Sequence, residues 1–190
     1  MLWAILTAMT APSSPVHSKK VQKAWTLYDW ANSVYSLVIT TTIFPIFYNA
    51  MTTVRAEDGT LVSDVVMFWG IEFLNTQLYS YVLATSFLVI IFLSPLLSGM
   101  ADYSGKKLTF MKIFCYSGAA GCASMFFFNP SHLEWSMASL FLANLGFWGS
   151  LGFYNAYLPE IAPPEEHDKL GARGYVMGYI GSVTLLLICL

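Results

Sequence analysis

An acidic residue and a series of small polar side chains lie within the first long apolar stretch of the chain. Asp29, Ser33, Ser36 and Thr40 are spaced i, i+4, i+7 and i+11, and Asn32 lies beside them. At about 100° per residue, this spacing places them along one face of a helix. Polar groups on a membrane helix face protein or a water-filled cavity. The pattern therefore predicts that this face lines a substrate cavity.

A local role is equally open for these side chains. Asp29 lies only four residues after Trp25, near the start of the apolar stretch, where it can favour the helix N-terminus or pair with Lys23. Serine and threonine hydroxyls can bond to their own helix or to a packed neighbour. Asp29 is thus a candidate for either a gate or a local capping role.

A second, weaker polar face lies further along the chain. Asn144 and Asn155 are eleven residues apart and share one face of a helix, with Trp148 between them. Asparagine in lipid requires hydrogen-bond partners, so this face predicts either contacts with substrate in the cavity or hydrogen bonds to another helix.

The remaining candidates for chemistry form no recognisable catalytic set. The three cysteines lack a C-x-x-C spacing, and the three histidines lie in separate loops. A Walker A motif is also absent, because Gly99 and Gly105 have the wrong separation for one and Leu108 follows the lysines. We therefore expect no enzyme activity, no metal site and no cofactor.

The composition indicates the elements that position these residues. Hydrophobic residues make up 56% of the chain and charged residues only 11%, which is typical of a membrane protein. The long apolar runs lack the alternation of barrel strands. They predict an all-α polytopic membrane protein with five transmembrane helices, the last truncated, at residues 25–48, 81–100, 108–128, 136–158 and 175–190.

The termini suggest how the domain is organised. Residues 1–18 are expected to form a flexible leader, and residues 19–190 an incomplete N-terminal transmembrane bundle. The long loop at residues 51–77 contains a short apolar run with Glu72, "VVMFWGIEFL". We expect this run to be an interfacial segment or an extension of the second helix, because it is too short to span the bilayer.

The basic residues predict the orientation in the membrane. Every Lys and Arg except Arg55 lies before the first predicted helix, between the second and third or near the start of the third, or after the fourth. This bias predicts that the N-terminus lies in the cytoplasm. We expect the protein to lie in the cell (cytoplasmic or inner) membrane. The net charge of −2 argues against nucleic acid as a partner and leaves the lipid bilayer and a small-molecule solute.

Small residues predict where helices approach closely. Gly174, Gly178 and Ser182 have small-xxx-small spacing in the last helix, as do Gly118 and Cys122 in the third. We expect packing surfaces there.

The turn after the second helix, "SGMADYSGKKL" at residues 98–108, is the most informative stretch. Gly105 suits the tight turn, Gly99 suits close approach of a helix, and Lys106 and Lys107 suit a cytoplasmic loop. Taken alone, it also fits an ordinary hairpin of the positive-inside kind.

This stretch resembles the cytoplasmic signature of the major facilitator superfamily, G-x-L-A-D-x-x-G-[RK]-[RK]. The matching residues are Ala101, Asp102, Gly105, Lys106 and Lys107. The sequence departs from the signature at three positions, with Ser98 for the leading glycine, Met100 for leucine and Tyr103 where a basic residue is common.

Several stretches in order resemble one branch, the vacuole-effluxer-like transporters. They are "WTLYDWANSVYSLVITTTIFPIFY", "NTQLYSYVLATSFL", "LSPLLSGMADYSGKK" and "GFYNAYLPEIAPPEEHDKLGARGYVMGYIGS". Members have about twelve helices, so the resemblance implies that a C-terminal helical half of the same protein is missing here.

The resemblance implies a secondary active transporter that exports a small solute by alternating access, with amino acids as candidate substrates and protons as the candidate coupling ion. It implies that helices 1 and 4 line the cavity and that Asp102 latches the two halves. Glu160 and Arg173 are expected to pair at the cytoplasmic mouth, or to be solvated separately. A non-transporting receptor or scaffold, or a membrane-embedded enzyme, are the alternatives.

Overall fold

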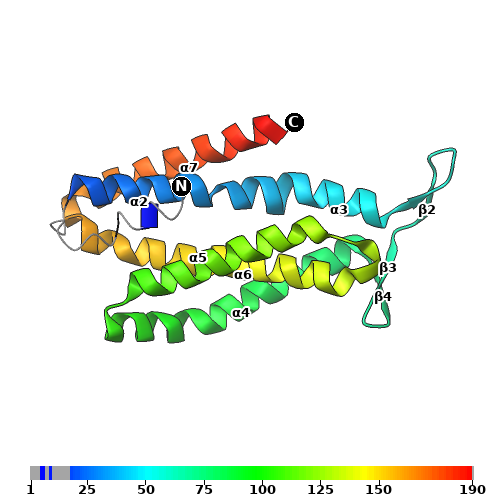
Figure 1. The fold of residues 1–190 in the computed structure, drawn as a ribbon, viewed down its shortest axis with the longest axis horizontal. Coiled ribbons are helices and arrows are strands. Elements are labelled where there is room, and N and C mark those ends of the chain that lie inside the picture. The colour runs from blue at the N-terminus through cyan, green and yellow to red at the C-terminus, as the bar shows by residue number, and fades with distance from the viewer. Residues whose placement is uncertain (1–4, 7–8, 10–17, 190) are drawn as a thin grey trace.

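The computed structural model describes residues 5–6, 9 and 18–189, and in this part of the chain five long helical rods lie side by side (Figure 1). The first rod consists of three consecutive pieces, α2 (Lys19–Asn32), the π-helical η1 (Tyr35–Ile43) and α3 (Phe44–Thr52). The others are α4 (Asn75–Ser104), α5 (Lys107–Ser124), α6 (Leu133–Ile161) and α7 (His167–Cys189). Single 3-10 turns, η2 (Met125–Phe127), η3 (Pro130–His132) and η4 (Pro164–Glu166), lie in the connections.

The all-α membrane architecture expected from the sequence is confirmed. Among the described residues, four helices are long and apolar enough to cross a membrane, namely Lys19–Thr52, Asn75–Ser104, Lys107–Phe127 and Pro164–Cys189. The remaining predicted span, residues 136–158, lies within α6, which has 29 residues. Large apolar side chains on the outside, such as Ile91 at 62% and Phe92 at 74% exposure, match a lipid environment. The chain is an integral membrane protein.

The helices extend beyond the apolar stretches that predicted them. The first rod starts at Lys19 rather than residue 25, because Ser18 caps it by accepting a hydrogen bond from the Lys20 backbone N–H at 3.3 Å. The second starts at Asn75 rather than residue 81 and continues through Pro95 to Ser104. Apolar runs mark only the central part of each helix, whereas the polar ends continue the same backbone hydrogen bonding.

The loop at residues 51–77 corrects one expectation. The run "VVMFWGIEFL" is not an extension of the second helix but a β-hairpin, β3 (Val65–Phe68) paired antiparallel with β4 (Ile71–Leu74). Trp69 (φ 50°) and Gly70 (φ 78°) form its turn, and positive φ at both central residues is the geometry that matches strand twist. A second ladder joins β1 (Val54–Arg55) and β2 (Leu61–Ser63).

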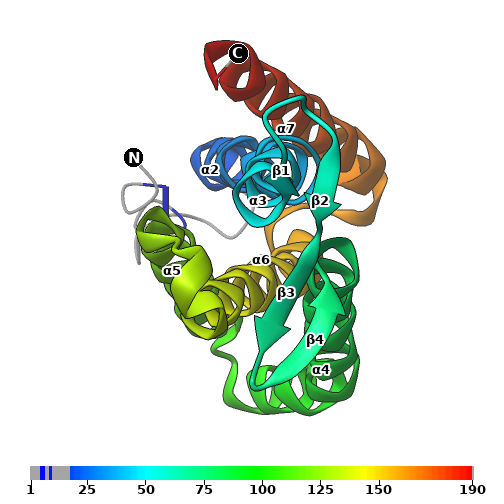
Figure 2. The ribbon, with the colours of Figure 1, turned by 90° about the vertical axis from the view of Figure 1, so that its right-hand side faces the viewer.

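The rods pack in two groups, as the end-on view shows (Figure 2). The helix α7 lies beside α2, and α6 lies between α5 and α4. Small residues set these distances, because a Cβ on Gly146 of α6 would overlap the backbone of Gly118 on α5. On α7, Gly174 adjoins Trp25 and Tyr154. The close packing expected at Gly118 and Gly174 is therefore confirmed.

Two hydrophobic clusters hold the two ends of the bundle. One contains Trp25, Tyr28 and Tyr154 at the end where α2 and α7 begin. The other contains Phe44 and Tyr48 near the hairpins. Most of the expected leader at residues 1–18 lies outside the described residues, and those described within it include the buried Ile5, Leu6 and Met9.

Candidate functional site

The turn between α4 and α5 positions the charged residues of the signature stretch. Gly105 adopts a left-handed conformation (φ 64°), and its N–H bonds to the carbonyl of Asp102 at 3.3 Å. The Lys106 N–H bonds to the carbonyl of Ala101 at 3.2 Å. Such a closure satisfies the last carbonyls of α4 and reverses the chain within two residues. Consequently α5 begins at Lys107, directly beside the end of α4.

Lys107 bridges two carboxylates from different helices. Its Nζ lies 3.0 Å from Oδ1 of Asp102 on α4 and 2.9 Å from Oε1 of Glu160 on α6. Glu160 therefore pairs with Lys107 and not with Arg173, because α6 ends beside the start of α5 while Arg173 lies on α7. The Asp102 side chain stays 62% exposed, which leaves it able to bind a further partner.

The other residues singled out in this region make no comparable contacts in the described part of the chain. Gly99 has open space where a Cβ would stand, so no described helix approaches it closely. Lys106 and Arg173 are exposed and form no ion pair with a described residue. The network at this end is thus Asp102, Lys107 and Glu160.

The structure places Asp29 at a helix–helix junction. Asp29 is 5% exposed, and its carboxylate accepts a hydrogen bond from the Ser33 hydroxyl at 3.2 Å. Gly178 of α7 faces both residues, since a Cβ there would lie 2.9 Å from Oδ2 of Asp29 and 2.6 Å from Oγ of Ser33. Asp29 forms no ion pair with any described residue, so a buried acid without a counter-charge sits where α2 meets α7.

Beyond Ser33 the first rod changes its winding. The π-helical segment η1 widens each turn to an i→i+5 repeat, so spacing of 100° per residue no longer applies from Tyr35 onward. Ser36 and Thr40 are half-buried and bond to their own helix, with the Thr40 hydroxyl donating to the Ser36 carbonyl at 2.7 Å. The Thr40 carbonyl in turn accepts from the Tyr79 hydroxyl of α4 at 2.8 Å.

Asn32 points in a different direction from Asp29. It lines a pocket of about 140 Å³ between the first rod, α5 and α6, together with Tyr35, Cys115 and Ser150. The Nδ2 of Asn32 and the hydroxyl of Tyr35 are buried there without a hydrogen-bond partner among the described residues. Asp29 and Ser33 thus face α7, whereas Asn32 faces this pocket.

The polar residues of α6 also divide into buried and exposed members. Asn144 donates its Nδ2 to the Ser86 hydroxyl of α4, and both side chains are buried. Asn155 is exposed, and Trp148 is 37% exposed with its ring 5.3 Å from that of Phe87. Asn144 therefore joins two helices, while Trp148 and Asn155 remain on the outer face of α6.

Two residues of these networks, Tyr79 and Ser86, were missed by the sequence reasoning. Each lies beside other polar residues in α4, and only the arrangement of the helices shows which of them has a partner on another helix. Within residues 5–6, 9 and 18–189, no group of three or more His, Cys, Asp or Glu side chains could hold a metal ion.

Comparisons with known proteins agree with this architecture. The family described as "Vacuole effluxer Atg22 like" matches residues 17–190. The "Uncharacterized MFS-type transporter YxiO" of Bacillus subtilis (strain 168) is 36% identical over 165 residues, which cover 86% of this chain. The chain spans 35% of the length of that relative. No solved structure matches.

Proposed function

Because the chain belongs to the vacuole effluxer Atg22-like family, we propose that it forms the first part of a secondary active transporter that works by alternating access. The observation that carries the proposal is the bridge from Lys107 to Asp102 and Glu160. It ties the turn between α4 and α5 to the end of α6, while the exposed Asp102 remains free to bind a second helical half.

The finer assignments belong to the same proposal. The exported solute is a small molecule, with amino acids as the first class to test, and protons are the coupling ion. We assign to the substrate cavity the first rod and the outer face of α6, which carries Trp148 and Asn155. Asp29 is the residue proposed to carry the proton, because it is a buried acid that lacks a cation partner among the described residues. The chain carries no catalytic step.

Transport by the full-length protein in proteoliposomes tests the bridge. K107Q leaves Asp102 and Glu160 unneutralised beside each other, so we expect transport of radiolabelled amino acids to fall at least tenfold. K106Q removes a neighbouring charge that bonds to no described carboxylate and serves as the matched control. Because ion pairs this exposed contribute less than about 1 kcal/mol to folding, thermal stability should barely change. Equal transport by K107Q and K106Q would show that the bridge from Lys107 to Asp102 and Glu160 is not needed for transport.

Two measurements separate the role of Asp29 from that of the bridge. For D29N we expect loss of accumulation driven by a pH gradient, with exchange of labelled for unlabelled solute retained. S33A removes only the hydroxyl that bonds the carboxylate and should keep both activities. If D29N accumulates solute like the unmodified protein, Asp29 does not carry the proton.

The membrane orientation is also part of the proposal, with the basic end of the bundle in the cytoplasm and the protein in the cell membrane. In a C189S background, a membrane-impermeant maleimide added to intact cells should label D58C in the long loop but not K106C. Labelling only of K106C would show the reverse orientation.

A further inference from the structure

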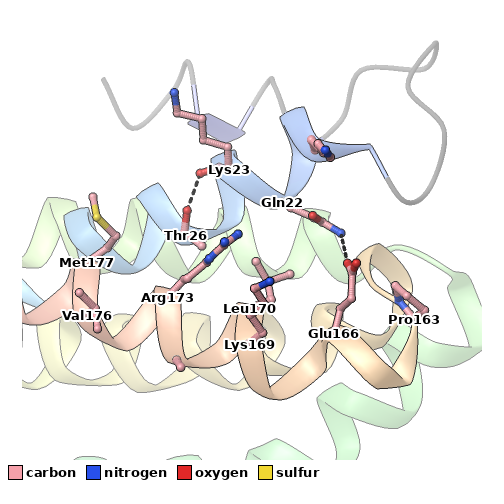
Figure 3. Close-up of a pocket in the computed structure, with 12 residues that line it drawn as sticks. Gln22, Lys23, Thr26, Pro163, Glu166, Lys169, Leu170, Arg173, Val176 and Met177 are labelled. Atoms are coloured by element: carbon pink, nitrogen blue, oxygen red, sulfur yellow. Dashed lines mark hydrogen bonds between the residues drawn. The ribbon is translucent and has the colours of Figure 1, made fainter.

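An open pocket lies between the first turns of α2 and α7, at the end of the bundle where both helices begin (Figure 3). Its volume is about 1070 Å³, and it is separate from the bridge at Lys107 and from the pocket beside Asn32. Residues of both helices line it, so its shape depends on the packing of α2 against α7.

The rim of this pocket is strongly cationic. Lys19, Lys23, Lys169 and Arg173 line it, against the single acid Glu166. None of the four cations forms an ion pair within the described part of the chain. Glu166 accepts a hydrogen bond from Nε2 of Gln22 at 3.4 Å (Figure 3). The N-termini of α2 and α7 add positive potential at the same end.

The inner wall of the pocket is apolar and continues along the membrane helix. Leu170, Val176 and Met177 line the pocket together with the charged residues. From Val176, a stripe at i+4, i+7 and i+11 follows α7, and its side chains are 47–68% exposed; they are Val176, Ile180, Val183 and Leu187. The cationic rim therefore leads directly onto an apolar stripe that stays exposed among the described residues.

We propose that this pocket binds an anionic phospholipid, with the headgroup phosphate at Lys169 and Arg173 of α7 and the acyl chains along the stripe from Val176 to Leu187. Free phosphate would satisfy the cations but not the apolar wall, whereas a zwitterionic lipid would cover the stripe without matching the charge. Basic pockets between membrane helices are a recognised setting for anionic headgroups. The proposal rests on the chain being a membrane protein and not on transport.

Lipid binding to the purified full-length protein tests this directly. Native mass spectrometry from mixed micelles containing dioleoyl phosphatidylglycerol and phosphatidylcholine in equal amounts should show preferential retention of phosphatidylglycerol. For the K169Q/R173Q double variant we expect at least tenfold weaker retention, since each basic residue near a headgroup contributes about 1 kcal/mol. K20Q/K106Q removes the same charge from exposed positions outside the pocket and should bind like the unmodified protein.

Two further measurements distinguish a lipid headgroup from free phosphate and control for misfolding of the charge variant. Soluble glycerol 3-phosphate should not compete with the lipid at equal concentration, and I180N/V183S, which leaves all charges in place, should weaken retention of the lipid. Equal retention of both lipids, equal loss in the two charge variants, or full competition by glycerol 3-phosphate would each overturn the proposal. All of these measurements use no gradient and no transported solute, so they remain decisive even if transport fails.

Discussion

Replacing Gly146 with alanine should separate α5 from α6 and destabilise the protein. A Cβ at this position would overlap the Cα and N of Gly118 and lie 2.7 Å from the carbonyl oxygen of Phe114. Carbon atoms pack at about 3.5–4.0 Å, so the helices must move apart by about 1 Å locally. All the obstructing atoms belong to the backbone of α5, and rotation of a side chain cannot relieve the overlap.

The change in the free energy of unfolding caused by G146A follows from two opposing effects. Overpacking of this kind costs about 1–3 kcal/mol. Alanine in place of glycine favours the helix by about 1 kcal/mol. We therefore expect G146A to lower the free energy of unfolding by up to about 2 kcal/mol, because the packing cost exceeds the gain in helix propensity over most of its range.

Gly152 on the same helix provides the matched control. No atom lies within 4 Å of a Cβ built there, so G152A should keep the gain in helix propensity without the packing cost. Unfolding of the full-length protein in mixed micelles with increasing SDS, followed by tryptophan fluorescence, measures both variants. A G146A protein as stable as G152A would refute the inference that backbone contact at Gly146 sets the distance between α5 and α6.

Other substitutions test the remaining contacts. N144L should destabilise the protein by about 1 kcal/mol in the same unfolding assay, because the buried Ser86 hydroxyl loses the hydrogen bond that it accepts from Asn144 and keeps only the one that it donates to the Leu83 carbonyl. S86A combined with N144L should cost less than the sum of the two single changes. G105A should cost about 1 kcal/mol, since alanine must adopt φ 64°. Hydrogen bonds from Thr60 lower the pKa of Asp58 below 3.8, so they stabilise this turn above that pH, and the stabilisation is lost as pH falls through the lowered pKa. T60V removes the hydroxyl bond but keeps the backbone N–H bond to Asp58, so in NMR titrations of the loop the pKa of Asp58 should rise only part of the way to its ordinary value.

The sequence was sufficient to predict the helical membrane architecture. Long apolar runs interrupted by charged turns predict spans, and the signature from Ser98 to Lys107 pointed to the family that residues 17–190 match. These signals are local, because each depends on residues close together in the chain. The helices nevertheless extend further than expected, since a polar end such as Lys19–Ala24 adds no hydropathy signal.

Features that depend on three-dimensional neighbours could not be predicted in the same way. Glu160 lies thirteen residues before Arg173 but bonds Lys107, more than fifty residues earlier, because α5 and α6 are adjacent. For Asn144 both substrate contact and helix–helix bonding were open, and the partner found is Ser86. The hairpin was missed because its turn residues, Trp69 and Gly70, lack the Asn-Gly or Asp-Gly signal of such turns.

The widened turns of η1 have a consequence for aligning this chain with its relatives. In an i→i+5 ladder each turn holds more residues than in an α-helix, so Tyr35–Ile43 changes the rotational phase between α2 and α3. In a relative whose first span is α-helical throughout, fewer residues would bring Trp25 and Phe44 onto the same neighbours. An alignment gap inside this membrane helix, usually taken as an error, has its natural position between residues 35 and 43.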